Sequence, residues 1–203
     1  MRFISHLDMT RFMARAIRRA ELPVWYTEGF NPHLYMTFAL PLSLGFESEY
    51  EVVDIRLLDD NYDISVLPQK LNEVCPPYIH FFDAAEPIKK AGDVAAAEFN
   101  ITFDDAGEIK NALNEFLSGD SITVLKKTKK GDIKQLEVAD KIKDFYVDIK
   151  DGNTVLKITL PAGSTENLNP ELYLTAFFEK SGKYFCYIVN RTAIFDLNGK
   201  PFK

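Results

Sequence analysis

The chain has 203 residues, of which 46% are hydrophobic and 27% are charged, and its formal net charge is −6. This composition is typical of a folded globular protein and excludes a disordered chain. The longest apolar runs have the length of a strand, so no membrane-spanning helix and no membrane partner are expected. The two cysteines, Cys75 and Cys186, form no cluster-binding array, which predicts small buried side chains, a reducing cytoplasmic location and no cofactor.

The charges are unevenly distributed along the chain. Five of the seven arginines fall in the first nineteen residues, where Asp8 is the single acid. Residues 47–63 instead carry seven carboxylates and one arginine, and residues 126–143 carry seven lysines and three acids. An acidic chain with two basic islands does not fit general nucleic-acid binding, so a polyanion would bind at these islands.

The first half of the chain predicts a helix followed by short strands. Ser5 and Asp8 form a helix start of the capping-box type, apolar residues recur at helical spacing up to Ala20, and Pro23 ends the helix. His80 lies in an apolar run and is expected to be a core histidine. The further elements expected here are strands at residues 34–42 and 49–58, a helix at 66–74 and a strand at 79–82.

The second half predicts a similar mixture of elements. The pattern breaks at residues 88–97, so we expect units at residues 1–90 and 91–203. The elements expected after the break are a strand at residues 99–103, a helix at 106–117, a strand at 122–125, a hairpin turning at Asp151-Gly152-Asn153, a helix begun by Asn169-Pro170 and a strand at 184–189. We therefore predict an α+β fold of two ferredoxin-like βαβ-type units with antiparallel sheets. Such a unit requires a strand before its first helix, so either residues 1–4 are a stub of that strand or the natural chain begins upstream of Met1.

The arginines of the first helix are the leading candidates for binding an anion. Planar guanidinium groups at one-turn spacing suit the oxygens of a phosphate backbone. The alternative is a solvated helix face neutralised by the acids of residues 47–63, and the sequence favours neither. The candidate residues are Arg2, Arg11, Arg15, Arg18 and Arg19.

The segment Tyr26–His33 contains a second group of candidates. Gly29 leaves backbone amides free for an anion, and Tyr26 and Phe30 offer rings for stacking a base, with Asn31 and His33 beside them. The alternative is a rigid loop that connects helix to sheet. His6 and His33 are candidates for a general acid or base, although a histidine bonded within a helix cap or loop is the more common case.

A lysine-rich hairpin tip is the third candidate region. Lys127, Lys129 and Lys130 would add phosphate contacts there, and a solvated turn is the alternative. The sequence contains no Walker A loop, no GxGxxG, HExxH or GxSxG motif and no zinc-type Cys/His pattern, so no metal site is expected.

Three motifs carry a resemblance to a known family: RFISHLD at residues 2–8, YTEGFNPH at 26–33 and FALPLSLG at 38–45. With these motifs the chain resembles the bacterial domain of unknown function that is fused to, or encoded beside, radical S-adenosylmethionine (radical SAM) enzymes. The motifs cover about the first quarter of the chain, and a looser match includes Asn190-Arg191-Thr192, which adds Arg191 to the anion-binding candidates. Where the family has Pro-Lys after Asn-Pro-His, this chain has Leu34-Tyr35, so one candidate phosphate contact is lost. The resemblance implies a cytoplasmic protein that acts with a radical SAM enzyme, and it supplies no catalytic residues.

Three functions remain open from the sequence. The first, which we expect, is a non-catalytic accessory module that binds RNA, such as tRNA or rRNA, for a radical SAM modification enzyme. The second is a metal-independent RNA-processing enzyme that uses His6 or His33, with Arg11 clamping a phosphate. The third is a protein-interaction domain that docks the radical SAM enzyme.

Overall fold

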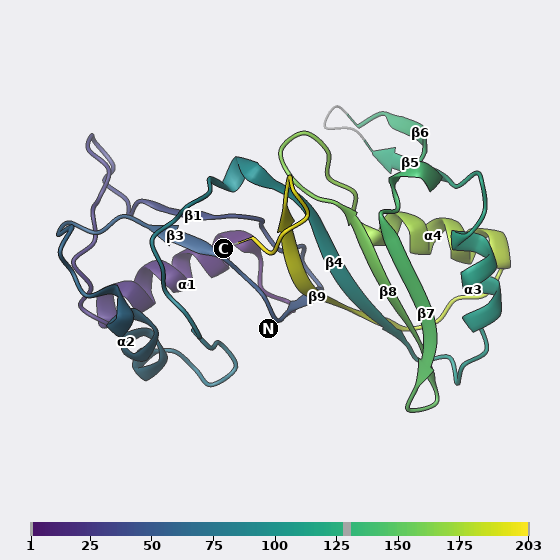
Figure 1. Cartoon of the computed structure of the whole chain (residues 1–203), viewed down its shortest axis with the longest axis horizontal. Coiled ribbons are helices and arrows are strands. Elements are labelled where there is room, and N and C mark those ends of the chain that lie inside the picture. Colours follow the sequence, from purple (N-terminus) through teal and green to yellow (C-terminus); the bar gives the residue numbers. More distant parts are fainter. Residues whose placement is uncertain (1, 128–130, 203) are drawn as a thin grey trace. The chain divides into compact units, whose positions relative to one another are not determined.

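The computed structural model describes residues 2–127 and 131–202 and shows a mixed α+β protein (Figure 1). Four α-helices occur in the described residues, and the strands pair mainly in antiparallel fashion. The chain divides into two compact units, one formed by residues 2–45 and 51–91 and the other by residues 46–50 and 92–202. In the described ranges, no helix combines the length and the apolar character needed to cross a membrane.

The first unit begins with the expected helix, α1 (His6–Arg19). The Ser5 hydroxyl accepts a hydrogen bond from the backbone N–H of Asp8 at 3.1 Å and donates one to the Asp8 carboxylate at 2.7 Å. These bonds satisfy one of the free amides of the first turn, so the predicted helix start is confirmed. The hydroxyl of Ser5 and then the Arg11 guanidinium lower the pKa of Asp8 below its ordinary value, which keeps a negative charge at the positive end of the helix.

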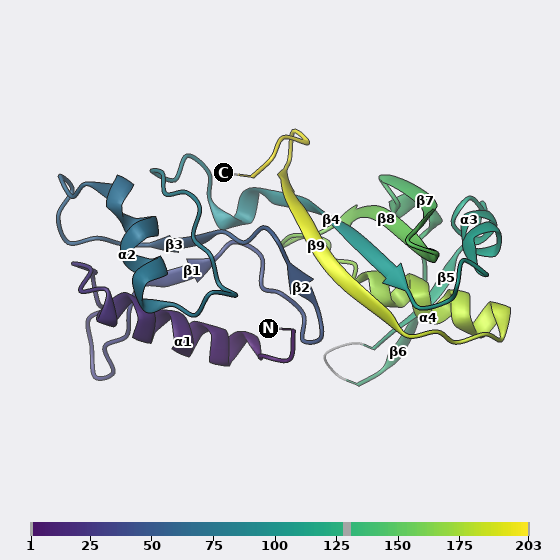
Figure 2. The ribbon, with the colours of Figure 1, turned by 90° about the horizontal axis from the view of Figure 1, so that it is seen from below.

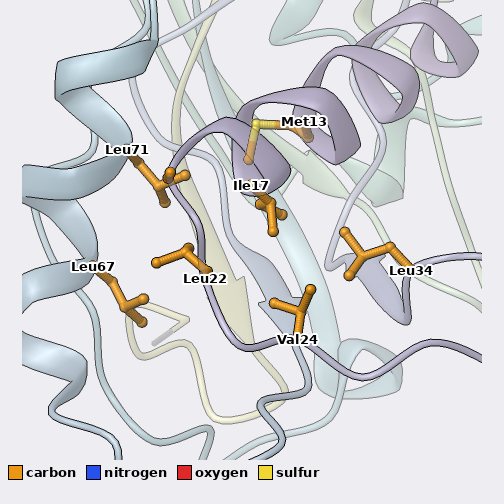
Figure 3. Packing of buried hydrophobic residues seen from close by; sticks show 8 residues of the cluster. Met13, Ile17, Leu22, Val24, Leu34, Leu67 and Leu71 are labelled. Atoms are coloured by element: carbon orange, nitrogen blue, oxygen red, sulfur yellow. The ribbon is translucent and has the colours of Figure 1, made fainter.

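The core of the first unit lies between its helices and its strands (Figure 3). Met13 and Ile17 of α1 pack against Leu67 and Leu71 of α2 (Leu67–Val74). The short strands β1 (Met36–Phe38) and β3 (Val53–Ile55) pair antiparallel, and η1 (Ile64–Val66) leads into α2. The two strands were predicted at these places but are much shorter than the apolar pattern indicates.

The strand expected at residues 79–82 is absent, and this prediction is wrong. The side-chain amide of Asn72, in α2, donates to the backbone C=O of Phe81 at 2.8 Å and accepts from its N–H at 2.9 Å. This one side chain supplies the pairing that a neighbouring strand would otherwise provide, so no sheet is needed there. His80 is exposed and is therefore not the core histidine that was expected.

The second unit is built on a five-stranded sheet with the order β2-β9-β4-β8-β7. Each of the four long strands pairs antiparallel with the next long strand in this order, whereas β2 pairs parallel with β9. The strands β5 and β6 and the short helix η3 lie between α3 and β7 in the chain. Without them the chain order is β4-α3-β7-β8-α4-β9, which together with this sheet order is compatible with the ferredoxin-like arrangement expected for the second half. The elements are β2 (Glu47–Ser48), η2 (Ala91–Asp93), β4 (Val94–Phe103), α3 (Lys110–Leu117), β5 (Thr123–Lys127), β6 (Ile133–Glu137), η3 (Ala139–Lys141), β7 (Asp144–Lys150), β8 (Asn153–Pro161), α4 (Pro170–Ser181) and β9 (Tyr187–Asp196).

Local sequence signals of the second unit match its structure closely. Asp151 and Gly152 both have positive φ, 52° and 82°, and form the two-residue turn between β7 and β8. Asn169 caps α4 by accepting from the N–H of Glu171 at 2.9 Å, and Gly182 ends it in the left-handed conformation. The helix α4 lies along one face of the sheet (Figure 2), where Phe178 is 6.3 Å from Phe103 of β4 between ring centroids. The closing strand was expected at residues 184–189 but lies later in the chain and is longer.

Asp105 connects the start of α3 to β8 and yields a first prediction. Its carboxylate is 4% exposed and accepts from the N–H groups of Gly107, Ile109 and Thr154 and from the Thr154 hydroxyl, at 2.7–3.2 Å. Burial alone would raise the pKa of Asp105, but these hydrogen bonds lower it below its ordinary value. In Asp105→Asn, one of the two acceptor oxygens is replaced by an NH₂ group, which would face the N–H and O–H donors that now bind the carboxylate. This variant should therefore reduce the free energy of unfolding by roughly 2–4 kcal/mol. Urea unfolding at pH 7 measures this loss.

The same experiment has a pH dependence and a matched control. Because the pKa of Asp105 is lower in the folded state, its stabilisation is complete above the unfolded value of about 4 and is lost as the pH falls through the folded value. The difference between wild type and Asp105→Asn should therefore shrink as the pH falls below about 4. Asp104→Asn, at the exposed neighbouring residue, should leave stability within about 0.5 kcal/mol of wild type. Equal losses for the two variants would contradict this role of Asp105.

Candidate functional site

The outward face of α1 carries the arginines that the sequence singled out. Arg11, Arg15, Arg18 and Arg19 are all exposed, while Met13, Ala16 and Ile17 face the core. Figure 2 shows α1 lying on one side of the first unit. Because Met13, Ala16 and Ile17 are buried, the exposed arginines lie on the solvent side of the helix. Arg11 forms an ion pair with Asp8 at 3.3 Å, and both side chains are about 60% exposed. Its charge is therefore locally balanced, although an exposed pair of this kind adds little stability.

Arg15 and Arg18 are held by uncharged partners. The Nε of Arg15 donates to the backbone C=O of Arg11 at 3.2 Å, and the Nε of Arg18 donates to the hydroxyl of Tyr26 at 3.0 Å. The Arg18 guanidinium also lies 5.7 Å from the centroid of the Tyr26 ring. These bonds orient the two guanidinium groups without neutralising them, and their terminal NH₂ groups keep the geometry that binds two oxygens at once.

Arg19 completes the group at the C-terminal end of α1. Together with Phe12, the side chains of Arg15, Arg18 and Arg19 line a shallow open depression on the surface. In the part of the chain that the structure describes, none of these three arginines forms an ion pair with a carboxylate. The acids of residues 47–63 therefore do not neutralise the arginines at the C-terminal end of α1. We call Arg15, Arg18 and Arg19 the arginine cluster.

The loop after Tyr26 is ordered by its own hydrogen bonds. The N–H of Thr27 donates to the C=O of His33 at 2.8 Å, and the N–H of His33 donates to the Thr27 hydroxyl at 3.1 Å. The Nδ1 atom of His33 lies 3.0 Å from that hydroxyl and 3.3 Å from the C=O of Asn31. Gly29, with φ of 121°, allows the tip to turn, and Phe30 beside it is fully exposed.

The two candidate catalytic histidines have different surroundings. The ring of His6, in the first turn of α1, packs edge-on against Phe38 with centroids 5.2 Å apart. His33 belongs to the loop that follows Tyr26, the partner of Arg18. The ring of His33 contacts the Thr27 hydroxyl and the C=O of Asn31, so the contacts given for the two histidines come from different groups.

The remaining candidates do not join the arginine cluster. The Arg2 guanidinium lies 5.0 Å from the centroid of the Phe3 ring, before α1 begins. Arg191 is on β9 in the second unit and is only 2% exposed, so it offers no surface to an anion. Lys129 and Lys130 lie outside the described residues, and of Lys127 only the backbone, in β5, is described.

The two cysteines are free thiols in different surroundings. Burial raises the pKa of the Cys75 thiol, and the nearby charge of Arg19 opposes that shift without reversing it. Cys75 is partly buried, but Cys186 is exposed, so the expectation that both are buried is wrong for Cys186. Across residues 2–127 and 131–202, no group of three or more His, Cys, Asp or Glu side chains is placed to hold a metal ion.

Residues 1–170 match a family described as "Uncharacterized protein conserved in bacteria (DUF2344)". The chain belongs to this family. The DUF2344 match includes all of α1, the loop at residues 27–33 and most of the second unit. It agrees with the expected bacterial domain of unknown function, and its description names no partner enzyme. No curated protein matches the chain.

Sequence reasoning missed a second surface of the first unit. The Arg56 guanidinium lies 4.7 Å from the centroid of the Trp25 ring, and Trp25 meets Tyr35 edge-on at 5.7 Å. Each of these residues alternates with neighbours that face the core, such as Val24 and Tyr26 around Trp25. That alternation was visible in the sequence and predicts side chains on the opposite face of a sheet, but it does not reveal which strands are neighbours.

The arginine cluster leads to a second prediction. Inorganic phosphate should bind there and raise the melting temperature, by about 3–6 °C at ten times its dissociation constant, compared with sodium chloride of equal ionic strength. Arg15→Gln/Arg18→Gln should lose most of this shift, as measured by differential scanning fluorimetry.

The control removes charges from the same helix without changing its net charge. Asp8→Asn/Arg11→Gln deletes the ion pair and leaves the arginine cluster intact, so the phosphate-dependent shift should persist even if the starting melting temperature falls. A shift that survives in the Arg15/Arg18 variant would place phosphate elsewhere.

Proposed function

We propose that the chain is an RNA-binding module without catalytic activity of its own, which acts as an accessory to a modification enzyme. The observation that carries this proposal is the arginine cluster, in which Arg15 and Arg18 are oriented by uncharged partners and keep their positive charge. Exposed guanidinium groups that are fixed in this way lose less side-chain freedom when a phosphate binds.

The spacing of the cluster favours a chain of phosphates over a single anion. Arg15 and Arg19 are four residues apart, which separates their Cα atoms by about 6 Å along the helix axis. Arg18 lies between them, so three guanidinium groups follow one another along the same face of the helix. An acidic protein repels RNA at long range, and binding therefore depends on this local positive surface.

A third prediction tests RNA binding by its response to salt. Fluorescence anisotropy with labelled bulk tRNA should show binding at 50 mM salt that weakens steeply by 200 mM. Each phosphate contact adds roughly 0.7–0.9 to the slope of log K against log salt, so Arg15→Gln/Arg18→Gln/Arg19→Gln should reduce the slope by about 2–3.

The control for this titration is again Asp8→Asn/Arg11→Gln. Its slope should stay close to that of wild type, because the deleted pair has no net charge. Absence of tRNA binding by the wild-type protein at 50 mM salt would refute the proposed function. An unchanged slope in the triple variant would leave RNA binding intact but assign it to another surface.

We also propose a radical SAM enzyme as the protein partner, on the basis of the RFISHLD, YTEGFNPH and FALPLSLG motifs. A second observation favours docking by this unit: the side chains of Phe3 and Leu44 are 76% and 62% exposed, and the N–H of Gly45 donates to the C=O of Arg2, which holds their two segments together. Exposed apolar side chains on neighbouring segments are typical of a protein interface.

A fourth prediction separates docking from RNA bridging. The protein should retain a radical SAM enzyme in a pull-down from native lysate after nuclease treatment. Phe3→Ser/Leu44→Ser should lose that enzyme, while Arg15→Gln/Arg18→Gln/Arg19→Gln should keep it. Loss of the enzyme on nuclease treatment alone would mean that RNA, and not this apolar surface, connects the two proteins.

A further inference from the structure

Three backbone segments of the first unit meet at Trp25, Tyr35 and Arg56. The N–H of Trp25 donates to the C=O of Arg56 at 2.8 Å, and the N–H of Tyr35 donates to the C=O of Trp25 at 3.1 Å. Tyr35 and Arg56 are also neighbours in the pairing that continues from β1 and β3, because the N–H of Arg56 donates to the C=O of Tyr35. The position of this group is therefore set by main-chain hydrogen bonds, which hold it more firmly than a surface loop would.

The side chains of this group are accessible at the surface to different extents. Tyr35 is 49% exposed, Arg56 is exposed, and Trp25 is partly buried beneath the Arg56 guanidinium. The charge of Arg56 is not balanced, since the described residues place no carboxylate within ion-pair distance of it. Asp54, two residues before Arg56 in the chain, does not neutralise it either: burial raises the pKa of Asp54, and no guanidinium opposes that shift.

We propose that Trp25, Tyr35 and Arg56 form a stacking site for an unpaired nucleobase of RNA. The exposed Tyr35 ring and the planar Arg56 guanidinium, which lies over the Trp25 ring, each offer a flat face to a flat ligand, and every nucleobase has such a face. The positive charge of Arg56 disfavours cationic ligands, such as methylated lysine, that aromatic surfaces otherwise bind. A base that is paired within a duplex is stacked between its neighbours, so this site selects single-stranded segments, loops or bulges.

The site lies next to the arginine cluster along the chain. Trp25 precedes Tyr26, whose hydroxyl holds Arg18, and adjacent residues of an extended segment point to opposite sides. One extended segment therefore presents a base-stacking group on one side and supports a phosphate-binding group on the other. This inference rests on the proposed function for its ligand, and it deepens that function by specifying unpaired RNA.

Trp25 provides the measurement, because it is the only tryptophan in the chain. All tryptophan emission reports on this site. Titration with an eight-nucleotide oligoadenylate should quench the emission, and the same length of oligoadenylate paired with oligouridylate should quench it far less. Anisotropy of the labelled strands, measured in parallel, reports total binding whether or not a base reaches Trp25.

Variants that keep Trp25 test the other two groups. Tyr35→Ala should weaken binding of the single strand roughly fivefold or more, as expected for the loss of one stacked base, and leave duplex binding unchanged. Arg56→Gln should act in the same direction and provides a second test if Tyr35→Ala is poorly folded. Tyr78→Ala, at another exposed tyrosine of the first unit, should bind both RNAs like wild type.

The outcomes separate this inference from the proposed function. RNA binding by anisotropy with no quenching, and with Tyr35→Ala equal to wild type, would overturn the stacking site and leave RNA binding standing. If no RNA binds, a titration with adenosine monophosphate distinguishes two cases. If adenosine monophosphate quenches the emission and Tyr35→Ala abolishes that quenching, the nucleobase site is supported while the RNA proposal fails. If it does not quench the emission, both proposals are overturned. A Trp25 emission that changes with protein concentration alone, together with a doubled mass in sedimentation, would show that a second copy of the chain covers the site and would also overturn the inference.

Discussion

The burial of one side of α1 is the constraint on which the first unit depends. Met13, Ala16 and Ile17 are removed from water by α2 and the strands beside it, and each large apolar side chain contributes about 1.5–3 kcal/mol when it is fully buried. Because a helix is rigid, fixing its apolar side also fixes its opposite side. The arginines are thus held outward by packing that does not involve them.

The balance of charge around α1 then decides what that outward side can do. At its N-terminal end, Arg11 is balanced by Asp8, which also serves the helix cap. At its C-terminal end, positive side chains interact favourably with the helix dipole, and this would be reason enough for Arg18 and Arg19 to be there. The hydroxyl of Tyr26 adds a feature that the dipole does not require, because it directs the Arg18 guanidinium while leaving its charge in place. A chain with a net charge of −6 therefore keeps a small positive surface.

Elements defined by neighbouring residues were predicted well. The cap of α1 at Ser5, the turn at Asp151-Gly152 and the start of α4 at Asn169 each depend on contacts within a few residues, which a sequence shows directly. Pairings between distant segments were predicted poorly. Residues 47–48 were expected to belong to a loop, but they form β2, whose partner β9 lies more than a hundred residues away and cannot be inferred from nearby residues. The strand expected at residues 79–82 is absent, and the side chain of Asn72 binds the backbone of Phe81 instead.

By itself the sequence determined the α+β class, the position of the four helices and the alignment of arginines along one of them, because helical periodicity is a local property. Only the tertiary structure decided which arginines are available to an anion, since that depends on what folding brings near: Asp8 pairs with Arg11, Tyr26 orients Arg18, and burial removes Arg191 from the surface. The grouping of Trp25, Tyr35 and Arg56 was likewise decided by folding. Their three segments are separate in the chain and become neighbours only through backbone hydrogen bonds, whose partners the order of residues does not specify.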